Sequence, residues 1–203
     1  MKLPCLLQFR ILKLAIKSLL SRPFTTKFPF APYEPIKEFR GRPRYSEEDC
    51  MGCGACAEVC PSKCIDVSDD ISANPPARSL LQHLDACICC GQCERYCPTE
   101  KGIKLTNEYD FVGFAPEDFE EKVEKELVLC ECCGDIIAPL DQLRWLAKRL
   151  GALAFANPTV MLVSQTQLTV VDEGVETDPK QDQRSQRVSI QCPKCRRKTS
   201  VVM

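Results

Sequence analysis

The chain has 203 residues, a length that allows one or two domains, and its 27% charged and 44% hydrophobic residues are typical of a folded globular protein. Lysine plus arginine (27) nearly balances aspartate plus glutamate (28), so the overall charge does not indicate a nucleic-acid-binding protein. A single histidine excludes hydrolytic sites and metal centres that depend on several histidines, whereas 16 cysteines indicate either disulfides or metal ligation.

The first 20 residues bear on the choice between disulfides and metal ligation. They are apolar but interrupted by charges, and no cleavage site of small residues follows an unbroken apolar run, so we expect no secretory signal. The longest uncharged run there, Leu3 to Phe9, is far shorter than the about 20 residues that span a bilayer. We therefore expect a reducing cytosolic setting, in which metal ligation is favoured.

Residues 1–22 predict an amphipathic docking helix that ends before Pro23. Its basic side chains recur at i, i+3 and i+7 and form one stripe: Arg10, Lys13 and Lys17. Two interpretations stay open, because such a helix packs on a protein subunit or lies in a membrane interface.

Residues 23–48 carry five prolines and predict an extended strap on another surface. Charge is uneven along the chain: residues 1–48 carry a net charge of +6, residues 49–110 carry −5 and residues 111–203 carry −2. A basic arm therefore precedes an acidic, cysteine-rich domain and a C-terminal extension.

An internal repeat occupies residues 49–110. Cys50-x-x-Cys53-x-x-Cys56-x-x-x-Cys60-Pro61 recurs 37 residues later as Cys87-x-x-Cys90-x-x-Cys93-x-x-x-Cys97-Pro98. A short strand-like run follows each copy, at residues 65–67 and 103–105. Two copies of one half-module predict a domain with pseudo-twofold symmetry.

The cysteine spacing is that of bacterial iron–sulfur proteins with two [4Fe-4S] clusters, in which the fourth cysteine of each run ligates the other cluster. We therefore assign the first cluster to Cys50, Cys53, Cys56 and Cys97. The second cluster is assigned to Cys87, Cys90, Cys93 and Cys60. Small residues (Gly52, Gly54, Ala55 and Gly91) let backbone N–H groups approach the sulfurs. Because cysteine fills every iron position, the pattern predicts electron transfer and no catalytic site.

Two further cysteine pairs lie in the C-terminal extension, Cys130-x-x-Cys133 and Cys192-x-x-Cys195. Two such knuckles suit one tetrahedral zinc ion, and we expect zinc there. A third iron–sulfur cluster and a metal-free or redox-active pair stay open as alternatives. Cys5, Cys64, Cys89 and Cys132 are then left over and are expected to be small buried apolar residues, with Cys132 an alternative ligand at the knuckles.

Periodicity predicts the secondary structure of residues 111–203. We expect helices at 117–129 and 140–150, a strand or hairpin at 159–171, a mobile loop at 177–186 and a short strand at 187–191. His83, whose local partner is Asp85, is expected to have a surface or structural role. The basic cluster Lys194, Arg196, Arg197 and Lys198 lacks interleaved aromatics and predicts a solvated face, so no nucleic-acid partner is expected.

Taken in order, these motifs resemble one protein family. A basic amphipathic N-terminus precedes Tyr33-Glu34-Pro35 and Phe39-Arg40-Gly41-Arg42-Pro43, and the two cluster motifs follow, with Cys64-Ile65 close behind the first. This order resembles the two-cluster iron–sulfur subunit of respiratory complex I. It is still more similar to the corresponding subunit of membrane-bound group 4 [NiFe] hydrogenases, the formate hydrogenlyase subunit 6 type, because of Cys130–Cys133 and Cys192-Pro193-Lys194-Cys195.

The resemblance implies an α+β fold: a ferredoxin-like pseudo-twofold domain with two [4Fe-4S] clusters, an N-terminal helix and strap, and a zinc-ribbon-like four-cysteine extension. It implies an electron-transfer subunit, not catalytic alone, that docks on membrane-arm subunits at the cytoplasmic side of the cell membrane. The subunit would connect an electron-input iron–sulfur or dehydrogenase module with the hydrogenase small and large subunits. The alternative is the equivalent subunit of a complex I-type quinone oxidoreductase.

Overall fold

The computed structural model describes residues 8–166 and 189–201, and the chain divides into two units, Met1–Phe39 and Arg40–Met203. In the first unit, helix α1 spans Phe9–Leu20, and every one of its residues is exposed. The expected helix is therefore confirmed over residues 9–20, while residues 1–7 lie outside the described part. Residues 21–39 form turns and bends without helix or strand. None of the helices in the described residues is long and apolar enough to cross a membrane.

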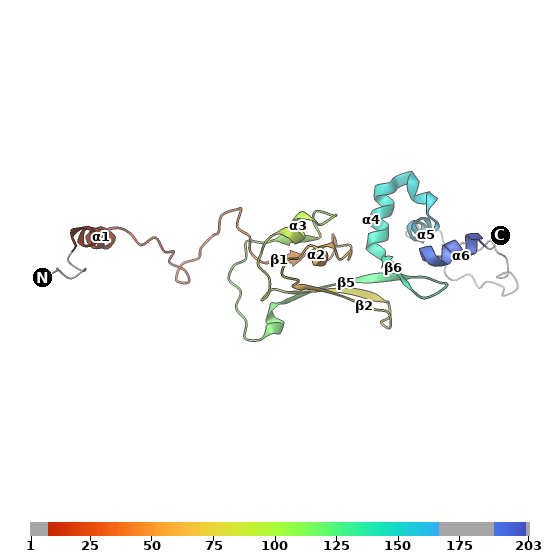
Figure 1. Cartoon of the computed structure of the whole chain (residues 1–203), viewed down its shortest axis with the longest axis horizontal. Helices are drawn as coiled ribbons and strands as arrows, with labels where there is room; N and C mark the ends of the chain where they lie inside the picture. Colours follow the sequence, from red (N-terminus) through yellow and green to blue (C-terminus); the bar gives the residue numbers. More distant parts are fainter. Residues whose placement is uncertain (1–7, 167–188, 202–203) are drawn as a thin grey trace. The chain divides into compact units, whose positions relative to one another are not determined.

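Two antiparallel sheets organise the second unit (Figure 1). The smaller sheet pairs β1 (Pro43–Tyr45) with β4 (Ile103–Leu105). The larger sheet has the order β2-β3-β5-β6, with β2 at Ile65–Asp70, β3 at Ala77–His83, β5 at Glu120–Leu129 and β6 at Ile136–Pro139. The last residues of the predicted strap thus form a strand of the cysteine-rich fold.

The sequence repeat is also a repeat of local structure. Helices α2 (Ala55–Glu58) and α3 (Gln92–Arg95) occupy equivalent positions, 37 residues apart. Each follows a glycine with positive φ, Gly54 at 76° and Gly91 at 78°, a conformation that L side chains rarely adopt. The expected runs after each motif are confirmed as β2 and β4.

The main core lies where the strands meet the cysteine loops. Leu80 on β3 faces Val123 on β5, and these side chains are only 1% and 2% exposed. The other buried members of this core are Cys50, Cys56, Cys64, Ile65, Cys93 and Ile103. Sulfur therefore takes up much of the space that branched aliphatic side chains fill in an ordinary core.

The helix predicted at residues 117–129 is wrong. Residues Pro116–Phe119 form a single 3-10 turn and β5 follows. Val123 and Leu127 are spaced i, i+4, which fits one face of a helix and also alternate positions of a strand. Glu121 and Lys125, which share the strand face of Val123 and Leu127, are charged. The sequence therefore lacks the alternation of apolar and polar residues that would indicate a strand. Glu121 accepts the backbone N–H of Tyr45 at 3.1 Å, and Lys125 pairs with Asp141 at 3.0 Å.

In the C-terminal region, the helix predicted at 140–150 is confirmed as α4 (Leu140–Leu150). The strand or hairpin predicted from residue 159 is wrong, because Pro158–Thr166 form helix α5. Asn157 accepts the backbone N–H of Thr159 at 3.1 Å, and proline stands at the first helical position, two signals that start a helix. Val160 and Val163 are buried in a second core with Leu143 of α4.

The remaining predictions for this region have mixed outcomes. Ser189 to Gln191 are not a strand, so that prediction is wrong for the residues described, while the loop predicted at 177–186 lies outside them. Helix α6 (Pro193–Val201) was not predicted, and a 3-10 helix at Gly151–Ala156 joins α4 to α5.

We expect Leu80→Ala to lower the free energy of unfolding by about 2–5 kcal/mol, because it leaves a cavity where β3 meets β5. Guanidinium titration of anaerobic protein measures the change. Val67→Ala is the matched control, since Val67 lies opposite Leu80 in the β2–β3 register but is 42% exposed. Equal losses for both variants would contradict the position of the core.

Candidate metal centres

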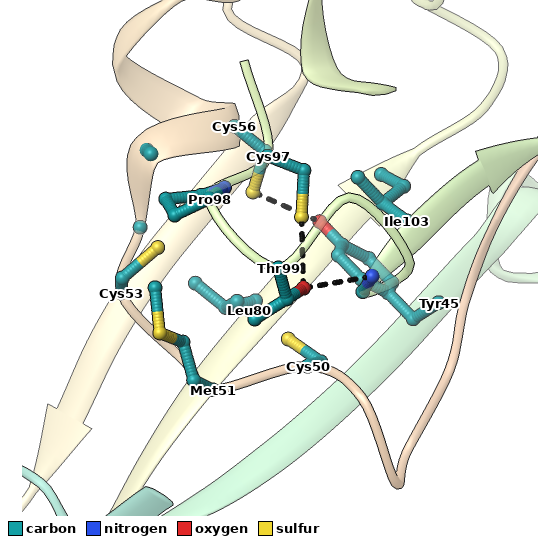
Figure 2. Close-up of a pocket in the computed structure, with 13 residues that line it drawn as sticks. Tyr45, Cys50, Met51, Cys53, Cys56, Leu80, Cys97, Pro98, Thr99 and Ile103 are labelled. Carbon is teal, nitrogen blue, oxygen red and sulfur yellow. Dashed lines mark hydrogen bonds between the residues drawn. The ribbon is translucent and has the colours of Figure 1, made fainter. Parts of the chain in front are cut away.

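The first pocket of interest is lined by four cysteines. Cys50, Cys53 and Cys56 come from the loop before and within α2, and Cys97 comes from the end of the second motif. Figure 2 shows these side chains around one space, together with Tyr45, Met51, Leu80, Pro98 and Ile103. Protein atoms leave about 300 Å³ unfilled here, a volume that includes space open to solvent. The fold thus brings together the four cysteines that spacing grouped as the first set.

The second motif contributes most of a second pocket. Cys87, Cys90 and Cys93 of the second motif line it together with Cys60 of the first. In both pockets, therefore, three cysteines belong to one motif and the fourth to the other. Cys64 and Cys89 also line this pocket.

The two pockets share one core. Cys56 of the first set and Cys93 of the second are both buried in it, and partly buried Cys60, Cys87 and Cys97 pack against it. Cysteines of the first set and of the second set therefore contribute to the same buried cluster of side chains.

Glycine is required at the loop of the first motif. Gly52 has a φ of 67°, and a Cβ there would lie 2.9 Å from the Cβ of Lys125. The loop therefore packs directly on β5. Burial raises the pKa of Cys50, and a hydrogen bond from the Gly52 backbone opposes that rise, as expected where backbone groups point toward sulfur.

Side chains also reach the sulfurs in equivalent places. The hydroxyl of Ser62 lies 3.5 Å from Cys60 Sγ, and the hydroxyl of Thr99, 37 residues later, lies 3.3 Å from Cys97 Sγ. Each hydroxyl follows its cysteine by two residues and precedes the next strand. Such groups hydrogen-bond to a thiolate and favour its charged form.

Each pocket also has one side-chain contact to sulfur that comes from a different kind of residue than in the other pocket. The Tyr45 hydroxyl lies 3.7 Å from Cys56 Sγ in the first pocket, and Gln82 Nε2 lies 4.0 Å from Cys87 Sγ in the second. Burial raises the pKa of Tyr45, so its hydroxyl keeps the proton that it can donate to sulfur. Gln82 is fully buried, so its amide is positioned by packing. Sequence reasoning missed both residues, because nothing in their spacing relates them to the cysteines.

Burial makes one deeply buried thiol in each pocket a poor acid. It raises the pKa of Cys56 to about 11 and that of Cys93 to about 12. Buried thiols of this kind release their protons only to a metal that replaces them. Four thiols around one space, with glycines and hydrogen-bond donors beside them, fit a [4Fe-4S] cluster in each pocket.

Cations lie against the cluster loops although the domain is acidic. Arg40 Nη1 donates to the carbonyl of Cys90 at 3.2 Å, and Arg78 Nη1 to that of Gly52 at 3.4 Å. Arg78 also pairs with Asp69 at 2.6 Å. The net acidity of the sequence did not reveal these cations, because their partners are distant along the chain.

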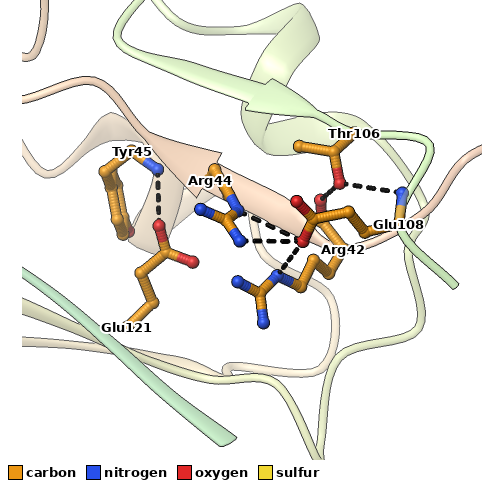
Figure 3. A network of polar contacts seen from close by, with 6 residues as sticks. All are labelled: Arg42, Arg44, Tyr45, Thr106, Glu108 and Glu121. Carbon is orange, nitrogen blue, oxygen red and sulfur yellow. Dashed lines mark hydrogen bonds and ion pairs between the residues drawn. The ribbon is translucent and has the colours of Figure 1, made fainter. Parts of the chain in front are cut away.

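Figure 3 shows the contacts that hold the end of the strap in the fold. Glu108 forms ion pairs with Arg42 at 2.8 Å and with Arg44 at 2.9 Å. Gly41 donates its N–H to the carbonyl of Thr106 at 2.8 Å, and a Cβ on Gly41 would lie 2.3 Å from the Glu108 carbonyl oxygen. The Arg-Gly-Arg-Pro-Arg segment is thereby tied to the chain that leaves the second motif.

The four cysteines of the C-terminal knuckles form a third, tighter group. The sulfurs of Cys130, Cys133, Cys192 and Cys195 all lie within 4.8 Å of one another. Cys130 follows β5, Cys133 lies in the turn before β6, and the other pair stands at the start of α6. The two halves of the expected site are therefore brought together although 58 residues separate them.

The spacing of these sulfurs is compatible with a single metal ion. A tetrahedral zinc ion with Zn–S bonds of about 2.3 Å places its ligand sulfurs about 3.8 Å apart. Cys133 Sγ and Cys192 Sγ lie 3.6 Å apart, which fits that arrangement. A cubane attaches each cysteine to a different iron and spreads the sulfurs farther. Among the residues that the structure describes, no group of cluster-pocket cysteines is as tight as the knuckle group.

Backbone N–H groups donate hydrogen bonds to the knuckle sulfurs and stabilise their thiolate forms. Cys192 N donates to Cys130 Sγ at 3.2 Å, and Cys195 N donates to Cys192 Sγ at 3.5 Å. The Cys192 N–H lowers the pKa of Cys130 to about 6. The prediction that Cys132 is buried is wrong, because its side chain is exposed, and Cys132 is not one of the four grouped cysteines.

Two surface predictions can be compared with the structure. His83 does not pair with Asp85; its Nε2 lies 3.1 Å from Asp66 and its Nδ1 lies 3.6 Å from Glu120. Both partners come from neighbouring strands, which explains why local sequence did not reveal them. In the basic cluster, Arg196 donates to Asn157 at 2.8 Å and so helps to join α6 to α5.

Comparison with known proteins places the cysteine-rich region in a family context. Residues 43–66 match the model of the 4Fe-4S binding domain. Over 111 residues the chain is 35% identical to formate hydrogenlyase subunit 6 of Escherichia coli (strain K12), an alignment that covers 54% of this chain and 59% of that protein. The chain thus spans about three-fifths of that relative's length.

A second relative is covered more fully. The chain is 32% identical over 114 residues to NADH-quinone oxidoreductase subunit I 2 of Geobacter metallireducens, covering 53% of this chain and 86% of that protein. Among solved structures, a chain of the membrane-bound sulfane sulfur reductase, an archaeal respiratory membrane complex, is 25% identical with a TM-score of 0.39 and covers 58% of this chain and 61% of that one. A TM-score of that size does not establish a common overall fold.

Proposed function

This chain belongs to the NADH-quinone oxidoreductase subunit I family of iron–sulfur electron-transfer subunits and is also related to formate hydrogenlyase subunit 6. We propose that it relays single electrons through two [4Fe-4S] clusters of a membrane-associated [NiFe] hydrogenase complex. The observation that carries the proposal is the crossed lining of the two pockets, each with three cysteines of one motif and the fourth of the other.

In this proposal, Cys50, Cys53, Cys56 and Cys97 hold the first cluster and Cys87, Cys90, Cys93 and Cys60 hold the second. One-electron redox chemistry is what the clusters supply when bound. The chain's part is to hold them in a shared core, close enough for electrons to pass, and to fill every iron position with sulfur. This arrangement leaves no iron position open to a substrate, and it supports a role in transfer without catalysis.

The side chains beside the sulfurs set how readily each site accepts an electron. Tyr45 and Thr99 reach sulfurs of the first pocket, while Ser62 and Gln82 reach those of the second. Hydrogen bonds to ligand sulfur offset the negative charge that reduction adds, and so they raise the reduction potential. Arg40 and Arg78, bonded to carbonyls of the two cluster loops, act in the same direction.

The four-cysteine group of the C-terminal extension is proposed to hold one zinc ion that is structural. The position of the group supports this role, because its cysteines join the turn between β5 and β6 to the start of α6. Ile137 is the partly buried apolar residue that packs against the sulfurs. A closed set of four thiolates is the donor set of structural zinc sites.

The proposed partners are the hydrogenase small and large subunits, membrane-arm subunits and an electron-input iron–sulfur or dehydrogenase subunit. Helix α1 is proposed to rest on the membrane surface at the cytoplasmic side of the cell membrane, as a peripheral anchor. Its apolar side chains are exposed in the described unit, and its basic stripe suits anionic headgroups.

A complex I-type NAD(P)H- or ferredoxin-quinone oxidoreductase is the alternative assembly. The 86% coverage of the subunit I relative favours it, against 59% of the formate hydrogenlyase subunit. The knuckle cysteines, which resemble those of the hydrogenlyase type, favour the hydrogenase.

The crossed ligand sets predict which variants behave alike. Chain purified anaerobically should hold about eight iron and eight sulfide in its two clusters and show two interacting cubane signals in electron paramagnetic resonance after reduction. Cys97→Ala should damage the same cluster as Cys53→Ala, so the two variants should leave the same residual spectrum.

Cys90→Ala is the matched control, because it occupies the position equivalent to Cys53 in the other motif. Its residual spectrum should differ from that of Cys97→Ala. If Cys97→Ala instead matches Cys90→Ala, each motif holds its own cluster and the crossed assignment is wrong. A wild-type chain without interacting cubanes would contradict the electron-transfer function itself.

The knuckle assignment predicts that Cys192→Ser lowers bound zinc from about one ion per chain to nearly none while both cubane signals remain. Elemental analysis beside the same resonance spectra measures this. Cys132→Ser, at the exposed thiol beside the site, should keep its zinc. Loss of a cubane signal in Cys192→Ser would move this group into the electron path, and iron in place of zinc in the wild type would refute the zinc assignment.

The anchor predicts that deleting residues 1–20 abolishes flotation of the protein with vesicles that contain anionic lipid. Replacing Lys13 and Lys17 by glutamine should weaken binding about fivefold per charge, since each lysine near an anionic surface contributes about 1 kcal/mol. Binding to purely zwitterionic vesicles should change little in that double variant. Undiminished flotation of the deleted chain would show that α1 does not hold the protein to lipid.

A further inference from the structure

The second pocket holds more thiols than one cluster needs. Beside the four cysteines proposed as its ligands, Cys64 lines the same space and is only 3% exposed. Its Sγ lies 3.5 Å from the Sγ of Cys60. The two sulfurs therefore reach the same part of the pocket.

Local structure aims both thiols at this place. The N–H of Lys63 donates to the carbonyl of Cys60 at 3.3 Å, and Lys63 has a φ of 50°, so the chain turns sharply between the two cysteines. The carbonyl of Cys64 accepts the N–H of His83 on β3 at 2.8 Å. Cys64 is thus anchored to the sheet by its own backbone, independently of the Cys60 side chain.

The pseudo-twofold gives an internal comparison at the first pocket. Glu100 repeats the left-handed turn of Lys63 with a φ of 61°, but Lys101 and Gly102 follow where Cys64 stands in the first half. A Cβ on Gly102 would lie 2.8 Å from Thr99 Oγ1 and 3.1 Å from Cys50 Cα. The lining of the first pocket contains four cysteines, and a side chain at Gly102 would collide with its neighbours.

We propose that Cys64 is a reserve ligand of the second cluster, which takes over the iron position of Cys60 whenever Cys60 releases it. The inference rests on the proposed assignment of Cys60 to that cluster. In the exchange, the iron–sulfur bond to Cys60 breaks and one to Cys64 forms, and the thiol proton of Cys64 passes to the Cys60 sulfur. No electron changes hands, and both sulfurs stay inside the pocket throughout.

The consequence is an asymmetry between the two sites. The fourth ligand of the second cluster is backed by a neighbour, whereas Cys97 at the first cluster is not. Cys89 also lines the second pocket, but it belongs to the loop of Cys87 and Cys90, and its thiol hydrogen-bonds with Cys87, the neighbour two residues before it, whereas the thiol beside Cys60 is that of Cys64. Cys89 is therefore the matched control cysteine and not the reserve.

The test uses the full chain purified anaerobically, with iron and labile sulfide content and electron paramagnetic resonance as readouts. Cys60→Ala and Cys64→Ala should each keep about eight iron, because either thiol completes the second cluster. The double variant Cys60→Ala/Cys64→Ala should fall to about four iron while the first-cluster signal, which reports a folded chain, persists. Cys60→Ala/Cys89→Ala should still hold about eight, and Cys97→Ala should lose its cluster.

Two results would overturn the inference. If Cys60→Ala alone loses the second cluster, or holds a three-iron cluster visible in the oxidised state, Cys64 does not replace it. If Cys64→Ala loses the cluster while Cys60→Ala keeps it, Cys64 is the resident ligand and there is no reserve. If the double variant Cys60→Ala/Cys64→Ala keeps about eight iron, the assignment of Cys60 to the second cluster is itself wrong. The single variants alone cannot reveal that error.

Discussion

Buried thiols are the constraint on which the rest of this structure depends. Cys50, Cys56, Cys64 and Cys93 occupy the centre of the main core, where an ordinary domain of this size places leucine and isoleucine. Thiols contribute little apolar area, and at this burial they bind a metal as thiolates or stay protonated. The strands, the left-handed glycines and the hydroxyls after each motif all arrange these sulfurs around two unfilled spaces, so the fold and its proposed clusters complete one another.

Strand β5 connects the cysteine-rich core to everything that follows it. At one end its Glu121 receives the N–H of Tyr45, in its middle Val123 packs on Leu80, and beyond its last residue Cys130 enters the knuckle group. Lys125 on the same strand pairs with Asp141 at the start of α4. The long strand, drawn in green in Figure 1, thus belongs to both the ferredoxin-like part and the C-terminal extension of the second unit.

The reach of sequence reasoning differed between regions for physical reasons. Helix α4 was predicted to the residue because a proline and a glycine bound it and its apolar residues follow helical spacing. The sequence of β5 favours a helix because the charged residues Glu121 and Lys125 lie on the same strand face as Val123 and Leu127, which removes the alternation typical of a strand. In the fold these two side chains bind the Tyr45 N–H and Asp141. The β-branched residues of α5 favour a strand, but the Asn157–Pro158 pair before them starts a helix.

The order and spacing of the cysteines by themselves were enough to predict two crossed sets of four and a separate set of four, and the fold brings the members of each set together. They also determined the family, together with the Arg-Gly-Arg segment. Only the tertiary structure decided which other groups reach the sulfurs: Tyr45, Gln82 and the second thiol at Cys64 come from strands and turns whose pairing depends on contacts far apart in the chain. Such contacts leave no periodic trace in the sequence, since each is set by how the sheet and the cysteine loops pack together.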